Sequence, residues 1–227
     1  MPQISNINKQ IETTMLKRLF PLLFLAIALT ACEKYPGTSD LSGKLMVYTH
    51  YDNHCDFSSF RTYHIADSLL ILDNQKLKPE YLSRDDFRAE VIIATIEDMM
   101  NAKGYIKVKD DSQADMGVIA SYISNTNTYV GYDYYWWYDY YWPMDYWDPF
   151  YNGWYPYYPY PVSYSYTVGT LCIEIANLKD AKTSSEKKIP FVWTALMAGV
   201  ESTGQINVAK ASSSIYQAFE QSPYIGR

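Results

Sequence analysis

Residues 83–108 read SRDDFRAEVIIATIEDMMNAKGYIKV, and this stretch decides the fold class of the chain. Ser83 with Asp86 three residues later matches a capping box, which predicts the start of a helix. Gly104 suits the left-handed residue that often follows a helix, and Tyr105–Val108 is typical of a strand. Apolar residues recur between these ends at helical spacing and form one stripe, comprising Ala89, Ile92, Ile93, Ile96, Met99 and Met100. We therefore expect an amphipathic helix that packs on a sheet.

Strand patterns surround this helix on both sides. They cover residues 45–49, 60–65, 105–108, 116–123, 168–176 and 189–199. The last element is a helix over residues 205–221, whose expected inner face comprises Ile206, Ala209, Ser213, Tyr216 and Phe219. The order lacks a regular βαβ alternation, which favours an α+β fold with two helices packed on one face of a mostly antiparallel sheet. The strands at 116–123 and 168–176 are expected to pair as neighbours.

The N-terminal segment has the features of a bacterial export signal. Lys17 and Arg18 form a short basic patch, and an apolar run follows from Leu19 to Ala31. A membrane-spanning helix needs about 20 apolar residues, so this shorter run fits a cleaved signal better. We predict a signal segment over residues 1–31, with Met15 as a second candidate start of translation.

Cys32 follows the signal segment and is the predicted lipidation site. Residues 29–32 read LTAC, which resembles the lipobox of bacterial lipoproteins, where the cysteine is acylated and becomes the new N-terminus. Residues 32–42 are polar, contain one proline and one glycine, and are expected to form a lipidated tether. Residues 43–227 are then expected to form a single α+β domain, because their length suits one globular unit.

The formal net charge of −6 limits the classes of partner. Nucleic acids bind basic surfaces, so we expect no nucleic-acid partner. The charge also gives no polybasic support for membrane binding, so lipid on Cys32 must provide the attachment. We therefore expect a lipid-anchored protein of the bacterial cell envelope, at the outer membrane. The sequence leaves open whether its domain faces the periplasm or the outside.

Two cysteines remain once Cys32 carries lipid, and these are Cys55 and Cys172. An exported compartment permits a disulfide between them. Two cysteines make no disulfide framework, however, and a domain of this length folds without one. We expect two separate, partly buried thiols, with the disulfide as the alternative.

Residues 129–166 are unlike the rest of the chain. They hold 15 of its 24 tyrosines and five of its six tryptophans. The motif YDYYW at residues 132–136 recurs at residues 138–142, and prolines follow from Pro143 onward. No Leu or Ile is present to build a core, so we predict a long Tyr/Trp/Pro-rich insertion between two sheet strands. The sheet core is expected to form without it.

Three interpretations of this insertion remain open. It is a loosely packed connection, a contact surface for an envelope protein, or a glycan-binding surface. Tyr and Trp suit a contact surface because they offer a large rigid area with a polar tip. In the glycan interpretation, rings stack on sugars while Asp133, Asp139 and Asp145 accept hydrogen bonds from hydroxyls. The candidate binding residues are Tyr132, Tyr135, Trp136, Trp137, Tyr138, Tyr141, Trp142, Trp147 and Trp154.

No catalytic or cofactor motif is recognisable in the chain. Residues 50–56 read HYDNHCD, and such groups can bind zinc, but their spacing matches no zinc motif. Asp56 is expected to cap the turn at Ser58 and Ser59 instead. The chain lacks a G-x-S-x-G elbow, an H-E-x-x-H motif, a C-x-x-C motif and a glycine-rich phosphate loop. We therefore predict no enzymatic activity, no catalytic residue, no metal site and no cofactor.

Five short stretches of the chain occur together in a characteristic order. They are Asp56-Phe57-Ser58 with Phe60-Arg61-Thr62-Tyr63, Gly104-Tyr105 with Ala114-Asp115-Met116, Gly169-Thr170-Leu171 with Ile173 and Ile175, Val192-Trp193, and Phe219 with Pro223. This set resembles the bacterial lipoproteins grouped as domain of unknown function 4136. Together the five stretches span residues 46–223. Ala195 stands where the family often has glycine, and Asn177 where aspartate is common.

The resemblance implies an α+β envelope lipoprotein and supplies no substrate, cofactor or active site. Members often carry an aromatic insertion before the Gly-Thr-Leu strand. Our leading hypothesis is a non-enzymatic envelope lipoprotein that binds or organises other envelope components. A glycan-binding lipoprotein is the alternative, and a hydrolase is the third hypothesis.

Overall fold

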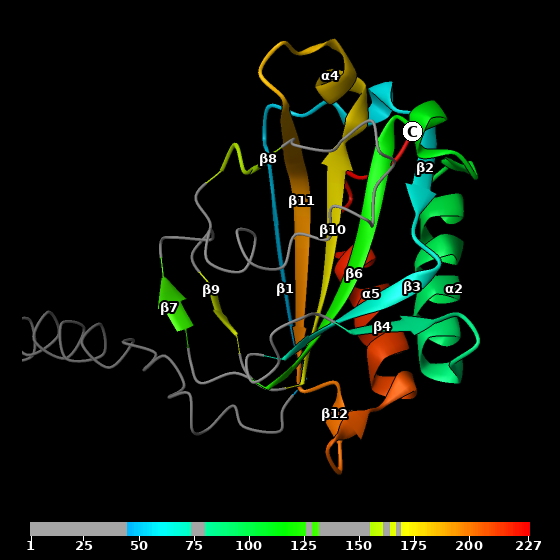
Figure 1. Cartoon of the computed structure of the whole chain (residues 1–227), viewed down its shortest axis with the longest axis vertical. Helices are drawn as coiled ribbons and strands as arrows, with labels where there is room; N and C mark the ends of the chain where they lie inside the picture. The colour runs from blue at the N-terminus through cyan, green and yellow to red at the C-terminus, as the bar shows by residue number, and fades with distance from the viewer. Residues whose placement is uncertain (1–44, 74–79, 126–128, 132–154, 161–163, 167–168) are drawn as a thin grey trace, which may run out of the picture. The chain divides into compact units, whose positions relative to one another are not determined.

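The computed structural model describes residues 45–73, 80–125, 129–131, 155–160, 164–166 and 169–227 (Figure 1). Gly43–Arg227 form one compact unit. The predicted α+β class is confirmed, because a large mixed sheet carries helices α2 (Phe87–Ala102) and α5 (Val208–Glu220) on one face.

Within the described residues, nine strands form one sheet in the order β1-β11-β10-β6-β2-β5, and β3, β4 and β8 pair off this path. The strands are β1 (Met46–Tyr51), β2 (Thr62–Ile65), β3 (Ser68–Asp73), β4 (Glu80–Ser83), β5 (Ile106–Lys107), β6 (Met116–Asn125), β8 (Tyr155–Tyr157), β10 (Thr170–Asn177) and β11 (Lys188–Ala198). Two small antiparallel pairs join β7 (Tyr129–Gly131) with β9 (Tyr164–Tyr166) and β12 (Glu201–Ser202) with β13 (Gln205–Ile206). The remaining helices of the described residues are α4 (Leu178–Thr183), η1 (Phe57–Ser59) and η2 (Asp111–Gln113).

The long central strands are antiparallel, whereas the shorter strands make the sheet mixed. β1, β11, β10 and β6 pair antiparallel with one another in that order, and the predicted pairing of β6 with β10 is confirmed. β2 and β3 both run parallel to β6 and lie end to end along it, at Met116–Val118 and Ser121–Asn125. The segments that form β3, β4 and α4 were not predicted, because each is short and has no clear period.

The core lies between the two helices and the inner face of the sheet. Its largest fully buried side chains include Trp193, Tyr63, Phe60, Phe219 and Ile96. Trp193 donates a hydrogen bond from Nε1 to Ser222 Oγ at 3.0 Å, and its ring centroid lies 5.2 Å from that of Phe219. The core therefore joins the sheet to α5 and to the C-terminal residues through both apolar contact and a satisfied polar group.

The helix α2 begins later than the sequence predicts. Its N-cap is Asp86, which accepts a hydrogen bond from Arg88 N at 2.8 Å, whereas Ser83 ends β4. Strand pairing with β3 therefore takes Ser83 out of the helix. The predicted end is confirmed, because Gly104 follows the helix with φ of +91°.

The predicted inner face of the last helix is partly wrong. α5 buries Ala211, Ser214, Ile215, Ala218 and Phe219. Ala209, Ser213 and Tyr216, which were expected to face inward, are exposed. Apolar and small residues occur on more than one stripe of this helix, so only packing against α2 and the sheet selects the buried one.

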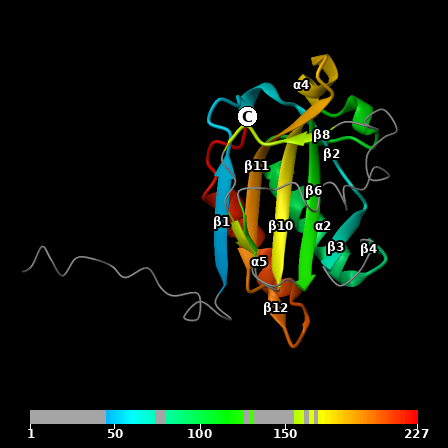
Figure 2. The ribbon, with the colours of Figure 1, turned by 60° about the vertical axis from the view of Figure 1, so that its left-hand side comes forward.

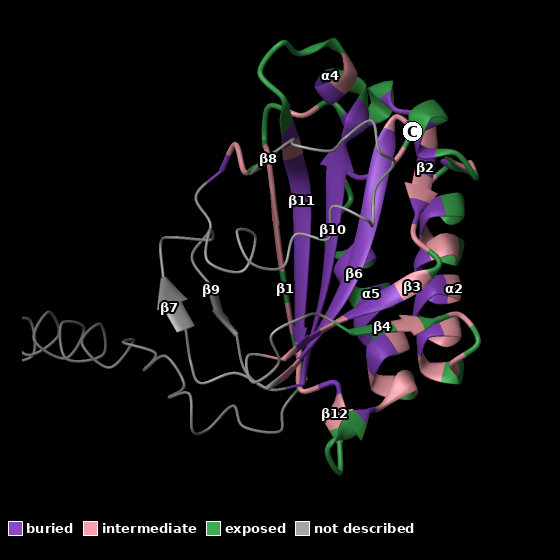
Figure 3. Ribbon diagram, in the orientation of Figure 1, coloured by how far each residue is buried: buried purple, intermediate pink, exposed green. Residues whose placement is uncertain are grey.

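The sheet is buried on both faces, although the two predicted helices cover only one. Every residue of β10 is buried, and β6 and β11 are coloured as buried along most of their length (Figure 3). Figure 2 looks onto the outer face, defined here as the face opposite α2 and α5, with β1, β11, β10 and β6 in front of the helices. This second buried face is where polar side chains gather.

Candidate binding surface on the outer face of the sheet

A row of polar side chains crosses three strands of the outer face. His50 of β1, Thr194 of β11 and Glu174 of β10 lie directly opposite one another in register. Residues in such positions project from the same face with β-carbons about 5 Å apart. Thr194 is fully buried and Glu174 is 4% exposed. Buried polar groups cost free energy unless they are hydrogen-bonded. The candidate site therefore consists of this row together with the residues that form hydrogen bonds to it.

Hydrogen-bond partners for this row come from residues 155–160, the C-terminal part of the aromatic insertion. β8 pairs parallel with β11 at Lys188–Pro190, and the chain then continues onto the outer face. The Tyr158 hydroxyl donates a hydrogen bond to Glu174 Oε1 at 2.6 Å. The hydroxyl oxygens of Tyr160 and Thr194 lie 2.9 Å apart. Two tyrosine hydroxyls thus satisfy two buried polar groups of the sheet.

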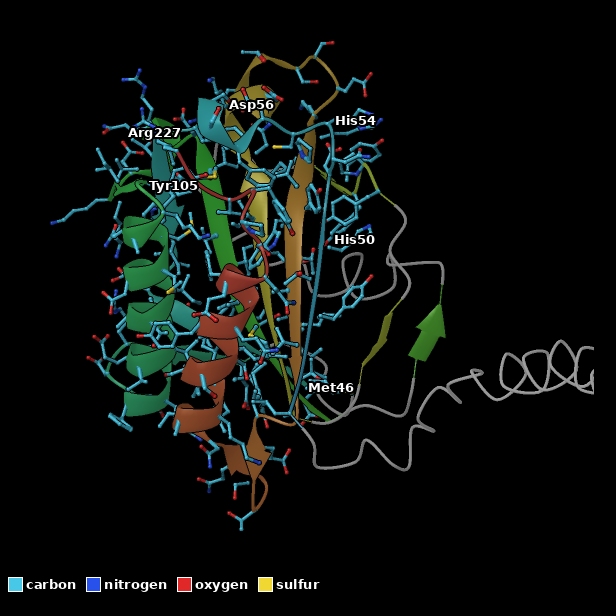
Figure 4. All side chains as sticks on the ribbon, turned by 180° about the vertical axis from the view of Figure 1, so that it is seen from behind. Met46, His50, His54, Asp56, Tyr105 and Arg227 are labelled. Carbon is cyan, nitrogen blue, oxygen red and sulfur yellow. The ribbon has the colours of Figure 1, made fainter. Side chains whose placement is uncertain are left out.

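The rings of Tyr158 and Tyr160 also pack on the outer face. Tyr158 stacks on Phe191 with ring centroids 5.2 Å apart, and Tyr160 meets the His50 ring edge-on at 4.7 Å. His50 projects away from the two helices (Figure 4). Tyr160 is 8% exposed and forms a buried cluster with Cys172 and Leu196. The expectation that the whole insertion lies outside the core is therefore wrong for these two tyrosines.

Burial favours the neutral forms of three titratable groups on the outer face, those of His50, Tyr160 and Cys172. Burial lowers the pKa of His50, so its imidazole is neutral at neutral pH. Burial also raises the pKa of the Tyr160 phenol and raises that of the Cys172 thiol well above its usual value. An activated nucleophile needs a lowered pKa or an adjacent base, which these shifts do not provide. This arrangement suits non-covalent contact.

The segment His50–Asp56 does not gather its polar groups into one site. Asp52 Oδ1 accepts a hydrogen bond from His54 N at 2.9 Å and lies 3.3 Å from His54 Nδ1. Asp56 caps η1 through Ser58, as predicted. Cys55 packs against the core on the helix side of the sheet, and burial raises its pKa to about 12. In the part of the chain that the structure describes, no three His, Cys, Asp or Glu side chains lie close enough to hold a metal ion.

The two thiols are separate, as predicted. Cys55 is partly buried and Cys172 is fully buried, and neither forms a disulfide. They lie on different faces of the sheet, Cys55 against the helix-side core and Cys172 in the outer cluster with Tyr160.

The residues predicted to bind partners are not placed by the structure. Cys32 and all nine candidate binding residues of the insertion lie outside the described residues. Tyr158, Tyr160, Glu174 and Thr194 were missed as site residues. The sequence indicates the last two of them, because Glu174 and Thr194 are polar residues within largely apolar strands. A polar side chain that is buried in such a strand needs a hydrogen-bond partner.

The chain is similar to known proteins at the level of the family and of solved structures. The family model described as Domain of unknown function (DUF4136) matches residues 47–224. No curated protein matches. Among solved structures, the chain is similar to a DUF4136 family protein from Bacteroides thetaiotaomicron VPI-5482, with 38% identity and a TM-score of 0.66, covering 80% of this chain and 97% of that one.

A second solved structure, a PelC dodecamer from Paraburkholderia phytofirmans, matches with 10% identity and a TM-score of 0.37, over 81% of this chain and 98% of that one. Among the described residues, no helix has the length and apolarity needed to span a membrane.

Proposed function

This chain belongs to the DUF4136 family, and we propose that it is a lipid-anchored envelope protein whose aromatic insertion is a non-catalytic binding surface. The proposal depends chiefly on the two hydroxyl contacts that hold Tyr158 and Tyr160 against the outer face. These contacts fix the C-terminal part of the insertion on a rigid sheet. A binding segment needs such a rigid support to hold its contact residues in a productive geometry.

Strands lie on both sides of residues 132–154 in the insertion. Tyr129–Gly131 pair antiparallel with Tyr164–Tyr166, and Tyr155–Tyr157 pair with β11. Residues 132–154 run between these strands and carry the nine candidate binding residues. Tyrosine and tryptophan dominate the energetics of protein interfaces because they bury a large area at low entropic cost. The composition of this stretch therefore supports a role in recognition.

A glycan is the second candidate ligand. The rings of Tyr48 and Tyr157 are 49% and 44% exposed, and Lys188 Nζ lies 5.6 Å from the Tyr157 ring centroid. Exposed tyrosine rings can stack on the apolar face of a sugar. If the ligand is a glycan, titration with an envelope polysaccharide should quench the tryptophan fluorescence of the protein. If the ligand is a protein, the chain should capture it without added polysaccharide.

We expect replacement of Trp136, Trp137 and Trp142 by alanine to abolish capture of the partner from a detergent extract of the envelope. The matched control replaces the same residues by phenylalanine, which keeps the rings and should retain most of the binding. The measurement compares the amount of each captured component with that captured by the wild-type chain. Equal capture by the alanine and wild-type proteins would contradict the proposal and move the binding site elsewhere.

The anchor has its own test. We expect Cys32→Ser to move the protein from the membrane pellet to the soluble fraction, because a serine cannot receive the lipid through a thioether. Fractionation at high salt measures this, since salt removes proteins held only by charge. A Cys55→Ser variant is the matched control and should stay with the membranes. Retention of the Cys32→Ser protein in the pellet would contradict the lipid anchor.

A further inference from the structure

Strand β1 lies at one edge of the sheet, and half of its backbone groups point outward. Asp52 N donates a hydrogen bond to Val192 O at 2.9 Å, which makes this pair a hydrogen-bonded pair of the antiparallel ladder. Such pairs alternate with pairs that make no bond, so His50, Tyr48 and Met46 also bond to β11. The N–H and C=O groups of Val47, Thr49 and Tyr51 must then point away from β11.

A second contact supports this assignment. Gln221 Nε2 lies 3.4 Å from Val47 O and 3.1 Å from Thr49 Oγ1, so it approaches the strand from the side that β11 does not occupy. In the described part of the chain, Val47 O is the one outward backbone group with a hydrogen-bond partner, and the outward groups of Thr49 and Tyr51 have none. A strand with such groups along its edge can accept another strand.

The edge lacks the features by which proteins usually prevent strand addition. Residues 46–51 read MVYTHY and contain no Lys, Asp, Glu or Pro, and β1 pairs with β11 without a register shift. Large apolar side chains at its start are also exposed, with Leu45 at 38% and Met46 at 37%. In Figure 2, β1 forms the margin of the sheet.

We propose that β1 pairs antiparallel with β1 of a second copy of this chain, about a twofold axis at Thr49. In this register, Thr49 faces its own counterpart, and Val47 faces Tyr51 of the other copy. The three pairs use all of the outward backbone groups, with two hydrogen bonds in each pair. On the outer side, Tyr48 faces His50 of the other copy, so aromatic rings meet and no like charges are opposed.

A second copy fits this edge better than a charged peptide does. The chain carries a net charge of −6, and residues 46–51 form an uncharged strip, so pairing two copies here opposes no like charges at the contact. Twofold symmetry also closes the assembly at two copies, because each chain uses its single β1 edge once. The proposal does not depend on the nine candidate binding residues of the insertion, because the pairing uses the backbone of residues 46–51.

The test compares Thr49→Pro with Thr49→Val in the full chain. Thr49 N–H points outward, so proline removes a donor of the new interface and leaves the β11 ladder intact. Valine keeps the N–H and the β-branched shape. In sedimentation at increasing concentration, the wild-type and Thr49→Val proteins should reach twice the mass of one chain. Thr49→Pro should weaken association by at least about tenfold.

Cysteine cross-linking tests the same register without depending on proline. Opposed Thr49 residues would have α-carbons about 5.5 Å apart, which a disulfide can bridge. Thr49→Cys should therefore oxidise to a covalent dimer, whereas Ser213→Cys, at an exposed position of α5, should not. A monomer at all concentrations, or equal cross-linking of both variants, would overturn the proposal. Slow amide exchange of Val47, Thr49 and Tyr51 in a monomer would also overturn it, because the edge would then be covered within the chain.

Discussion

Replacement of Ile96 by aspartate is expected to unfold the domain. Ile96 is fully buried on α2, within the core cluster between the helices and the sheet. Aspartate at this position is an unpaired charge in an apolar environment, which costs about 4 kcal/mol or more. Domains of this size are stable by about 5–15 kcal/mol, so the variant should lose most or all of its stability.

The matched control is Phe87→Asp, which makes the same kind of change at the first residue of the same helix. Phe87 is 68% exposed, and a negative charge is favourable near a helix N-terminus. Its stability should stay within about 0.5 kcal/mol of the wild type. Thermal and denaturant unfolding measure both variants. An unchanged melting temperature for Ile96→Asp would show that this helix buries a different stripe.

Replacement of Tyr160 by alanine is expected to destabilise the domain by about 3 kcal/mol. The ring is nearly buried against His50, Cys172 and Leu196, so its removal leaves a cavity on the outer face. The Thr194 hydroxyl also loses its tyrosine partner in a fully buried position. Both losses add to the cost of the substitution.

Tyr160→Phe separates these two contributions. It keeps the ring and should cost only about 1 kcal/mol, the usual value of one hydrogen bond. Combining it with Thr194→Val removes both hydroxyls, and the double variant should be more stable than the sum of the single losses predicts. Unfolding of the four proteins by denaturant completes the cycle. Equal stability of the wild type and Tyr160→Ala would show that the insertion contributes nothing to the core.

The stability of the Tyr160→Ala variant shows whether part of the aromatic insertion belongs to the core. The sequence predicts that residues 129–166 lie outside the core, because they contain no leucine or isoleucine. That inference treats aliphatic side chains as the only core material. Tyr160 instead combines ring burial with a hydroxyl bond to Thr194, which suits a sheet face that is itself partly polar. A deletion of the insertion that is meant to leave the domain folded should therefore keep residues 155–160.

Regular periods made much of the fold predictable from the sequence. The stripe around Ile96 fixes the buried face of α2, and Gly104 ends this helix because a left-handed residue is favourable there. The order of strands and helices predicts the α+β class with both helices on one face. The pairing of β6 with β10 follows from their positions at the two ends of the insertion.

The short elements could not be predicted, because their conformation depends on neighbours far away in sequence. β2 and β3 run parallel to β6, and no local pattern records that register. Ser83 has the sequence of a helix cap, yet it pairs in β4 because β3 lies beside it. In α5, Tyr216 and Ile215 are both plausible inner residues, and contact with α2 and the sheet decides between them.

The sequence by itself determined the fold class, the buried face of the first long helix, the candidate lipidation site at Cys32 and the unusual composition of residues 129–166. Those features depend on local spacing or on composition, which a sequence records directly. Only the tertiary structure decided that Tyr158 and Tyr160 satisfy Glu174 and Thr194, and that Val47, Thr49 and Tyr51 turn their backbone groups outward. Both results depend on which strands lie side by side, because register determines which side chains and backbone groups meet a partner and which do not.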